Sequence, residues 1–204
     1  MELSLGSLLQ LGVLSVKSPK AAARSLLNLQ LSRQAIWIAF AISIIPTVLV
    51  SQIAFRFLPA ELQAYWGDAM ARPIQTAIQQ GVFWLLVTVA LHRFGRWGSR
   101  RGTFYETLLI VAWWQIIFVG FQLAQVVVYL VLLIYVPLGE VLGIAGLALV
   151  FWCLTQFIVE LHGLKSGWLA LLGVILSLLF AAITLIFALV TILSLLGQGG
   201  VVNV

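Results

Sequence analysis

The sequence predicts an all-α polytopic membrane protein, a bundle of five transmembrane helices preceded by N-terminal interfacial amphipathic helices. Of its 204 residues, 63% are hydrophobic and only 8% are charged, whereas soluble proteins carry roughly 25% charged residues. Five apolar segments are long enough for a helix to cross a ~30 Å hydrocarbon core, which takes about 20 residues. The predicted spans are 35–57, 73–94, 104–136, 138–161 and 168–196, all within one transmembrane domain over 35–196.

Residues 1–34 are predicted to lie at the membrane surface. The apolar stretch 3–16 is too short to span, and its cations follow it, which is the wrong order for a signal peptide. Ser18 followed by Pro19 predicts a helix start, because proline is favoured at the first helical position. We expect both pieces to be interfacial helices, with packing on the protein's own surface as the alternative.

The first two spans contain polar groups that should avoid lipid. Pro46 lies mid-span and should kink the first helix. Ser43, Thr47 and Ser51 form a stripe on one face, a pattern typical of helix–helix contact. The second span begins with several glutamines and is the weakest of the five assignments.

The third span begins with a capping box. Thr103 can accept from the amide of Glu106, and the Glu106 carboxylate can reach back to the amide of Thr103. From there the apolar run continues to Val136, where Pro137 should stop the helix.

Five polar residues lie within the third and fourth spans. Steps of seven and three residues place the first three on one helical face, and the last two are four residues apart. Buried amides in lipid need partners, so helix packing is the preferred interpretation, and a transport path is the alternative. These residues are Gln115, Gln122, Gln125, Gln156 and Glu160. Glu160 lies close to the membrane surface, and we expect it to pair with Lys165 or a neighbouring arginine, with a transport role as the alternative. In the fourth span, Gly139 and Gly143 form a GxxxG pair that permits close helix approach.

The distribution of cations predicts the orientation. Alternating the loops puts nine of the eleven Lys and Arg residues on one side, and leaves only Arg56 and Arg72 on the other. The positive-inside rule then makes the N-terminus and the basic loops cytoplasmic, with the short tail 197–204 outside. The cations predicted to contact lipid headgroups are Lys17, Lys20, Arg24, Arg33, Arg93, Arg96, Arg100 and Arg101.

Several classes of function lack sequence support. The pI near 9.9 comes from cations beside membrane segments, which suits anionic lipid better than nucleic acid. Intramembrane proteolysis needs a Ser/His dyad, paired aspartates or an H-E-x-x-H run, and we predict no enzyme activity. We predict that His92 and His162 lie at the membrane surface. We also predict no cofactor and no metal site, because His92, His162 and Glu160 lack ligand spacing.

Three motifs resemble the bacterial branch of the Yip family. The run 18–24 (SPKAAAR) resembles a P-x-x-x-x-R lead, and the run 93–104 (RFGRWGSRRGTF) resembles the glycine-rich turn before the third span. The run 157–163 (FIVELHG) is similar to the F-I-x-E-L-H-G end of the fourth span. The resemblance covers essentially the whole chain and implies a fold more than an activity. The eukaryotic D-L-Y-G-P signature is absent, so no GTPase partner is implied.

The expected function is a non-catalytic scaffold in the bacterial inner membrane. Its basic cytoplasmic surface should contact anionic lipids and organise the membrane or partner proteins, among them a second copy of the chain or another membrane protein. The alternative is a small transporter or channel component that uses the polar intramembrane face.

Overall fold

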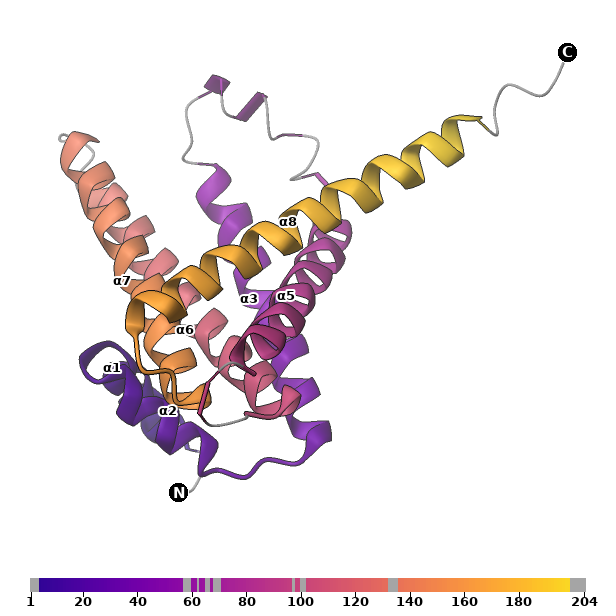
Figure 1. Cartoon of the computed structure of the whole chain (residues 1–204). Helices are drawn as coiled ribbons and strands as arrows, with labels where there is room; N and C mark the ends of the chain where they lie inside the picture. Colours follow the sequence, from indigo (N-terminus) through magenta and orange to yellow (C-terminus); the bar gives the residue numbers. More distant parts are fainter. Residues whose placement is uncertain are drawn as a thin grey trace, which may run out of the picture.

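The chain forms a helical membrane bundle (Figure 1). The computed structural model describes residues 4–56, 60–61, 63–64, 67, 71–96, 98–99, 102–131 and 136–198. Over these residues the structure is all-helical and has no strand, which confirms the predicted fold class. The helices are α1 (Leu5–Lys17), α2 (Pro19–Leu27), α3 (Arg33–Phe55), α5 (Pro73–Gly95), α6 (Phe104–Val131), α7 (Val136–His162) and α8 (Gly167–Gln198). The five from α3 onward are long and apolar enough to span a membrane.

The spanning helices alternate in direction, so the starts of some helices lie beside the ends of others at each end of the bundle. Figure 1 shows α1 and α2 packed at the end where α3 and α6 begin and where α5 and α7 finish. We call this the basic end; it is marked by Arg33, Gly95, Phe104 and His162. The opposite end, where α3 finishes and α5 begins, is called the distal end.

Two helix starts predicted from the sequence are confirmed. Thr103 N donates to Glu106 Oε2 at 2.6 Å, and Glu106 N donates to Thr103 Oγ1 at 3.2 Å, which completes the capping box of α6. Helix α2 begins at Pro19, although the Ser18 side chain makes no cap hydrogen bond.

The boundary between the third and fourth spans differs from the prediction. In the structure α6 ends at Val131, α7 begins at Val136, and Pro137 lies in the first turn of α7. Proline is compatible with a first turn, because the amide it lacks would have no helical acceptor there. The apolar run is therefore shared by two helices, which continuous hydrophobicity could not reveal.

Helix α6 occupies the centre of the bundle. Trp114 is 1% exposed, and its Nε1 donates to Val150 O of α7 at 2.8 Å. The Trp114 ring also lies 4.8 Å from the ring of Trp84 in α5 and stacks on Phe118 at 5.3 Å. Trp114 thus joins three spanning helices and satisfies its one donor within the core.

Two of the three hydroxyl residues in the stripe on α3 are buried, as expected for a helix-contact face, and Ser51 is half-buried. Ser43 donates to Phe40 O and Thr47 donates to Ser43 O, so these hydroxyls are satisfied within their own helix. Small residues on this face let α3 approach its main neighbour, α6.

Helix α8 packs through its first half only. Ala170, Val174, Ser177 and Ala181 are buried at intervals of three or four residues. No side chain described after Ala181 is buried, and Figure 1 shows α8 leaning away from the bundle.

Gly173 lies in a crowded environment and Gly120 in an open one, so substituting each of them tests the packing of α5 against α8. A Cβ at Gly173 would overlap the Phe94 ring of α5, whereas a Cβ at Gly120 meets nothing within 4 Å. We expect Gly173→Ala to destabilise the bundle by about 1–2 kcal/mol, since overpacking outweighs the ~1 kcal/mol gain in helix propensity. Thermal unfolding in mild detergent measures the effect. Gly120→Ala is the matched control and should unfold at the same or a higher temperature; equal losses in both variants would contradict the α5–α8 packing.

Candidate functional site at the basic end of the bundle

Helix α1 is attached to α6 by one buried hydroxyl. Ser15 is fully buried, and its Oγ accepts from Trp113 Nε1 at 2.9 Å while donating to Leu11 O at 2.7 Å. Trp113 lies nine residues after the start of α6, about 14 Å along the helix axis. Helix α1 therefore contacts the bundle well below the start of the third span.

The other face of α1 is apolar and exposed. Leu9, Val13 and Val16 are 71%, 55% and 47% exposed, and Lys17, its last residue, is its only charged one. A helix that exposes such a face at this depth is suited to contact acyl chains. One face of α1 therefore packs on the protein, and the other faces outward; the interfacial placement of α1 stays a prediction.

Helix α2 belongs to the same hydrophobic core as the spanning helices. Ala22, Ala23 and Leu26 are buried within it, and the helix packs mainly on α7. Small alanines allow the backbone of α2 to lie close to α7.

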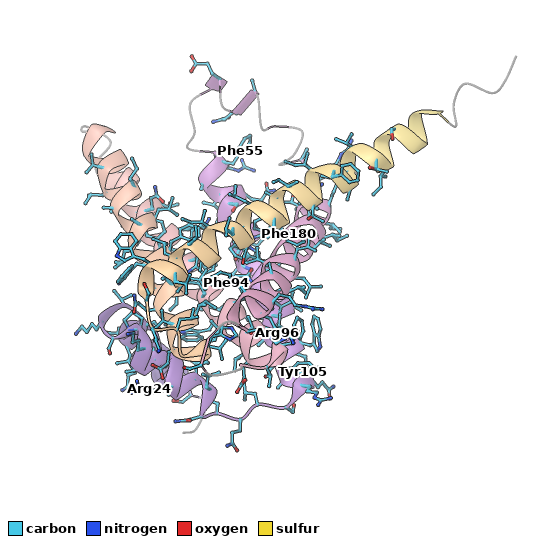
Figure 2. All side chains as sticks on the ribbon, in the orientation of Figure 1. Arg24, Phe55, Phe94, Arg96, Tyr105 and Phe180 are labelled. Atoms are coloured by element: carbon cyan, nitrogen blue, oxygen red, sulfur yellow. The ribbon has the colours of Figure 1, made fainter. Side chains whose placement is uncertain are left out.

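An ion pair joins α2 to α7. Arg24 Nε donates to Glu160 Oε1 at 2.7 Å, and Arg24 Nη2 donates to Glu160 Oε2 at 3.0 Å, a bidentate geometry. The hydrogen bond to Glu160, together with its charge, raises the pKa of the Arg24 guanidinium. Figure 2 shows Arg24 on α2 at the edge of the basic end. The carboxylate that the sequence offered as a transport residue therefore has a structural partner.

Most of the other predicted headgroup cations lie on the surface of this end. Lys17, Lys20, Arg33, Arg93 and Arg96 are exposed, and so is Lys165. Arg33 lies 5.0 Å from the centre of the Tyr105 ring, a cation–π contact between α3 and α6. Figure 2 shows Arg96 and Tyr105 at this end and Phe55 at the other. Arg100 and Arg101 fall outside the described residues.

His162 is enclosed by glycines, although the sequence placed it at the membrane surface. The side chain is 0% exposed. A Cβ at Gly95 would overlap its imidazole ring, and a Cβ at Gly98 would overlap its carbonyl oxygen. Ser99 Oγ adds a hydrogen bond of 2.8 Å to Gly163 O, next to His162. The turn between α5 and α6 therefore wraps the end of α7, and it needs glycine to approach so closely.

The imidazole of His162 has no hydrogen-bond partner in the described part of the chain. Both its Nδ1 and its Nε2 are buried, and so is Nδ1 of His92. Among the described residues no three His, Cys, Asp or Glu side chains come together as a metal site. The burial of His162 against Gly95 and Gly98 allows the turn between α5 and α6 to pack closely on the end of α7.

The intramembrane amides are spread along the bundle. Gln115 is fully buried, and neither its Nε2 nor its Oε1 has a partner among the described residues. Gln122 and Gln125 line a pocket between α6 and α7 near the distal end. The fourth predicted amide, Gln156, is half-buried and faces Gly167 at the start of α8. Of the first three amides, only Gln122 and Gln125 line a common pocket.

Two features of the basic end were not predicted from the sequence. The Ser15–Trp113 hydrogen bond joins residues 98 positions apart, and no local pattern in the sequence of α1 indicated this contact. The glycines at 95, 98 and 102 were visible as a turn, but their spacing did not identify His162 as the group they enclose.

The fold and its five apolar spanning helices define an integral membrane protein of the polytopic α-helical class. The chain matches no protein-family model, and no curated protein or solved structure matches it. The resemblance to the Yip family therefore stays a prediction from sequence motifs.

The ion pair predicts how α2 is held. In a Cys153→Ser background, a cysteine placed at the buried Ala23 should react slowly with a maleimide, because this residue lies on the buried face of α2, which packs on α7. Arg24→Glu should raise the labelling rate severalfold by repelling Glu160. Adding Glu160→Arg should restore slow labelling. Lys20→Glu, the same charge reversal on the same helix, is the control and should change little; rapid labelling of the double swap would contradict the pairing.

The enclosure of His162 predicts a coupling between two substitutions. Gly95→Ala should lower the unfolding temperature in detergent, because its Cβ overlaps the imidazole. His162→Ala removes the ring, so the double variant should be more stable than the sum of the single effects by about 1–3 kcal/mol. Gly98→Ala should not be rescued by His162→Ala, since its Cβ meets the backbone carbonyl of residue 162. Equal rescue of both glycine variants would contradict this geometry.

Proposed function

We propose that this protein is a non-catalytic membrane scaffold whose basic end contacts anionic lipid headgroups. The observation that carries the proposal is the combination of exposed cations and an exposed apolar helix face at one end of the bundle. Lys17 and Lys20 flank the junction of α1 and α2, directly beside the outward-facing Val16. Acyl-chain contact and headgroup contact can therefore occur on the same element.

The charge difference between the ends supports an electrostatic role. Each cation near an anionic leaflet contributes on the order of 1 kcal/mol, and salt limits this attraction to a distance of about 8 Å. Arg24 has a different role, because its charge is paired with Glu160 and it serves to position α2. Arg100 and Arg101, which the sequence also predicts to contact headgroups, lie outside the described residues and do not enter the argument.

The positive-inside rule makes the basic end cytoplasmic in this proposal, in a bacterial inner membrane as the Yip resemblance implies. A helix that enters only one leaflet enlarges that leaflet relative to the other. Helix α1 is 13 residues long, or about 20 Å, and is held in place by Ser15 and the Arg24 ion pair through α2. A scaffold of this kind would organise the surrounding lipid, and partner proteins through that lipid.

Transport is the weaker proposal. Its strongest residue was Glu160, a membrane carboxylate, and this carboxylate is bound to Arg24 at the edge of the bundle. The buried amide of Gln115 does not line the pocket that contains Gln122 and Gln125.

The lipid proposal predicts an end-specific loss of binding. Lys17→Gln with Lys20→Gln should lower the affinity for phosphatidylglycerol about threefold to tenfold, a discounted share of the ~1 kcal/mol per cation. Native mass spectrometry of protein extracted from mixed phosphatidylcholine and phosphatidylglycerol vesicles measures the retained lipid.

The control removes two charges from the distal end, where Arg56 and Arg72 are also exposed. Arg56→Gln with Arg72→Gln should leave phosphatidylglycerol retention unchanged. An equal loss in both double variants would contradict the proposal, because it would show attraction by net charge without a defined surface.

A further inference from the structure

The distal half of the α6–α7 interface contains a pocket that the scaffold proposal does not use. It has a volume of about 320 Å³ and is lined by Phe118, Phe121, Gln122, Gln125, Gly143, Ile144 and Leu147. We propose that it binds a neutral lipid with a free hydroxyl group, of the diacylglycerol type, from the distal leaflet. This proposal is independent of anionic lipid at the basic end.

Two carboxamides supply the polar part of the pocket. Gln122 Oε1 is buried and has no hydrogen-bond partner among the described residues. A buried acceptor without a partner is costly, so a ligand that brings a hydrogen-bond donor is favoured there. A hydroxyl group supplies that donor, whereas a ligand with only carbonyl groups does not.

Gly143 on α7 leaves space for the side-chain amide of Gln125 on the other side of the pocket. A Cβ at Gly143 would lie only 2.6 Å from Gln125 Nε2, so the absence of a side chain at this position allows the amide to lie against α7. The Gln125 amide is a donor at the edge of the same pocket, and a hydroxyl oxygen can accept from such a group.

The absence of charge in the pocket disfavours a phosphate group. None of the described residues that line it is charged. Gln122 and Gln125 belong to α6, one of the helices that are long and apolar enough to span a membrane. Burying an uncompensated phosphate among such residues is costly, whereas a hydroxyl group beside ester groups is neutral and carries no such cost.

The rim of the pocket faces outward, where acyl chains can leave. Ile144 is 71% exposed and Leu147 is 40% exposed, and both line the pocket from α7. The rings of Phe118 and Phe121, 6.2 Å apart, close the other side with apolar surface. A lipid with a small polar head and two apolar chains matches this division between an inner polar wall and an outer apolar rim.

The test measures retention of dioleoylglycerol by the full chain extracted from doped phosphatidylcholine vesicles. The wild type should retain it saturably. Gln122→Leu should lower the affinity about fivefold to tenfold, the value of one hydrogen bond. Ile144→Trp should abolish retention by filling the pocket from its exposed rim, which does not disturb the core. Gln75→Leu, the same change at an exposed position of α5, should retain dioleoylglycerol as the wild type does.

Three results would overturn the proposal: no saturable retention by the wild type, wild-type retention in both pocket variants, or equally good retention of phosphatidic acid. The Lys17→Gln and Lys20→Gln variant should bind dioleoylglycerol normally, and Gln122→Leu should bind phosphatidylglycerol normally. These crossed measurements distinguish failure at the pocket from failure at the basic end.

Discussion

The structure depends on the burial of α6. Half of the 18-residue apolar segment of this helix is buried inside the protein, which is the largest buried share among the five candidate spans. In lipid, an apolar surface alone does not draw helices together, so close packing and a few interhelical hydrogen bonds must do so. Trp114 provides both, through its ring contacts with α5 and its hydrogen bond to the backbone of α7. The adjacent residue, Trp113, joins α6 to α1 by its hydrogen bond to Ser15. Two consecutive tryptophans thus connect the interior of the bundle with α1, whose opposite face is apolar and exposed.

Charged and neutral polar groups occupy different places in the bundle. The cations of the basic end are exposed, and an ion pair there joins α2 to α7. At the distal end of the α6–α7 interface, polar groups are neutral amides within the span. This division follows from the cost of desolvation, which permits charge near water and only neutral groups deeper in the membrane. Where the buried hydroxyls Ser43 and Thr47 occur, the helix backbone satisfies them.

The features that were predictable from the sequence are those governed by local rules. Apolar length identified five spanning helices, and the spacing of Thr103 and Glu106 identified the start of α6. Features that depend on contacts between distant segments were not predictable. The amphipathic character of residues 1–34 was visible, but not the burial of Ser15 against Trp113. The carboxylate of Glu160 suggested a cationic neighbour, and the sequence offered several. His162 appeared to be a surface residue, because nothing local shows that the preceding turn folds over it.

Attachment of α8 through only its first half has a mechanical consequence. The helix is 32 residues long, about 48 Å, so it exceeds a hydrocarbon core of ~30 Å and either inclines or extends beyond that core. Its buried contacts lie between Ala170 and Ala181, and beyond that point no described side chain is buried. A change in the tilt of this second half would therefore leave the contacts of Trp114 in place. Helix tilt is one of the ways in which membrane proteins accommodate a bilayer that is thinner or thicker than their spans.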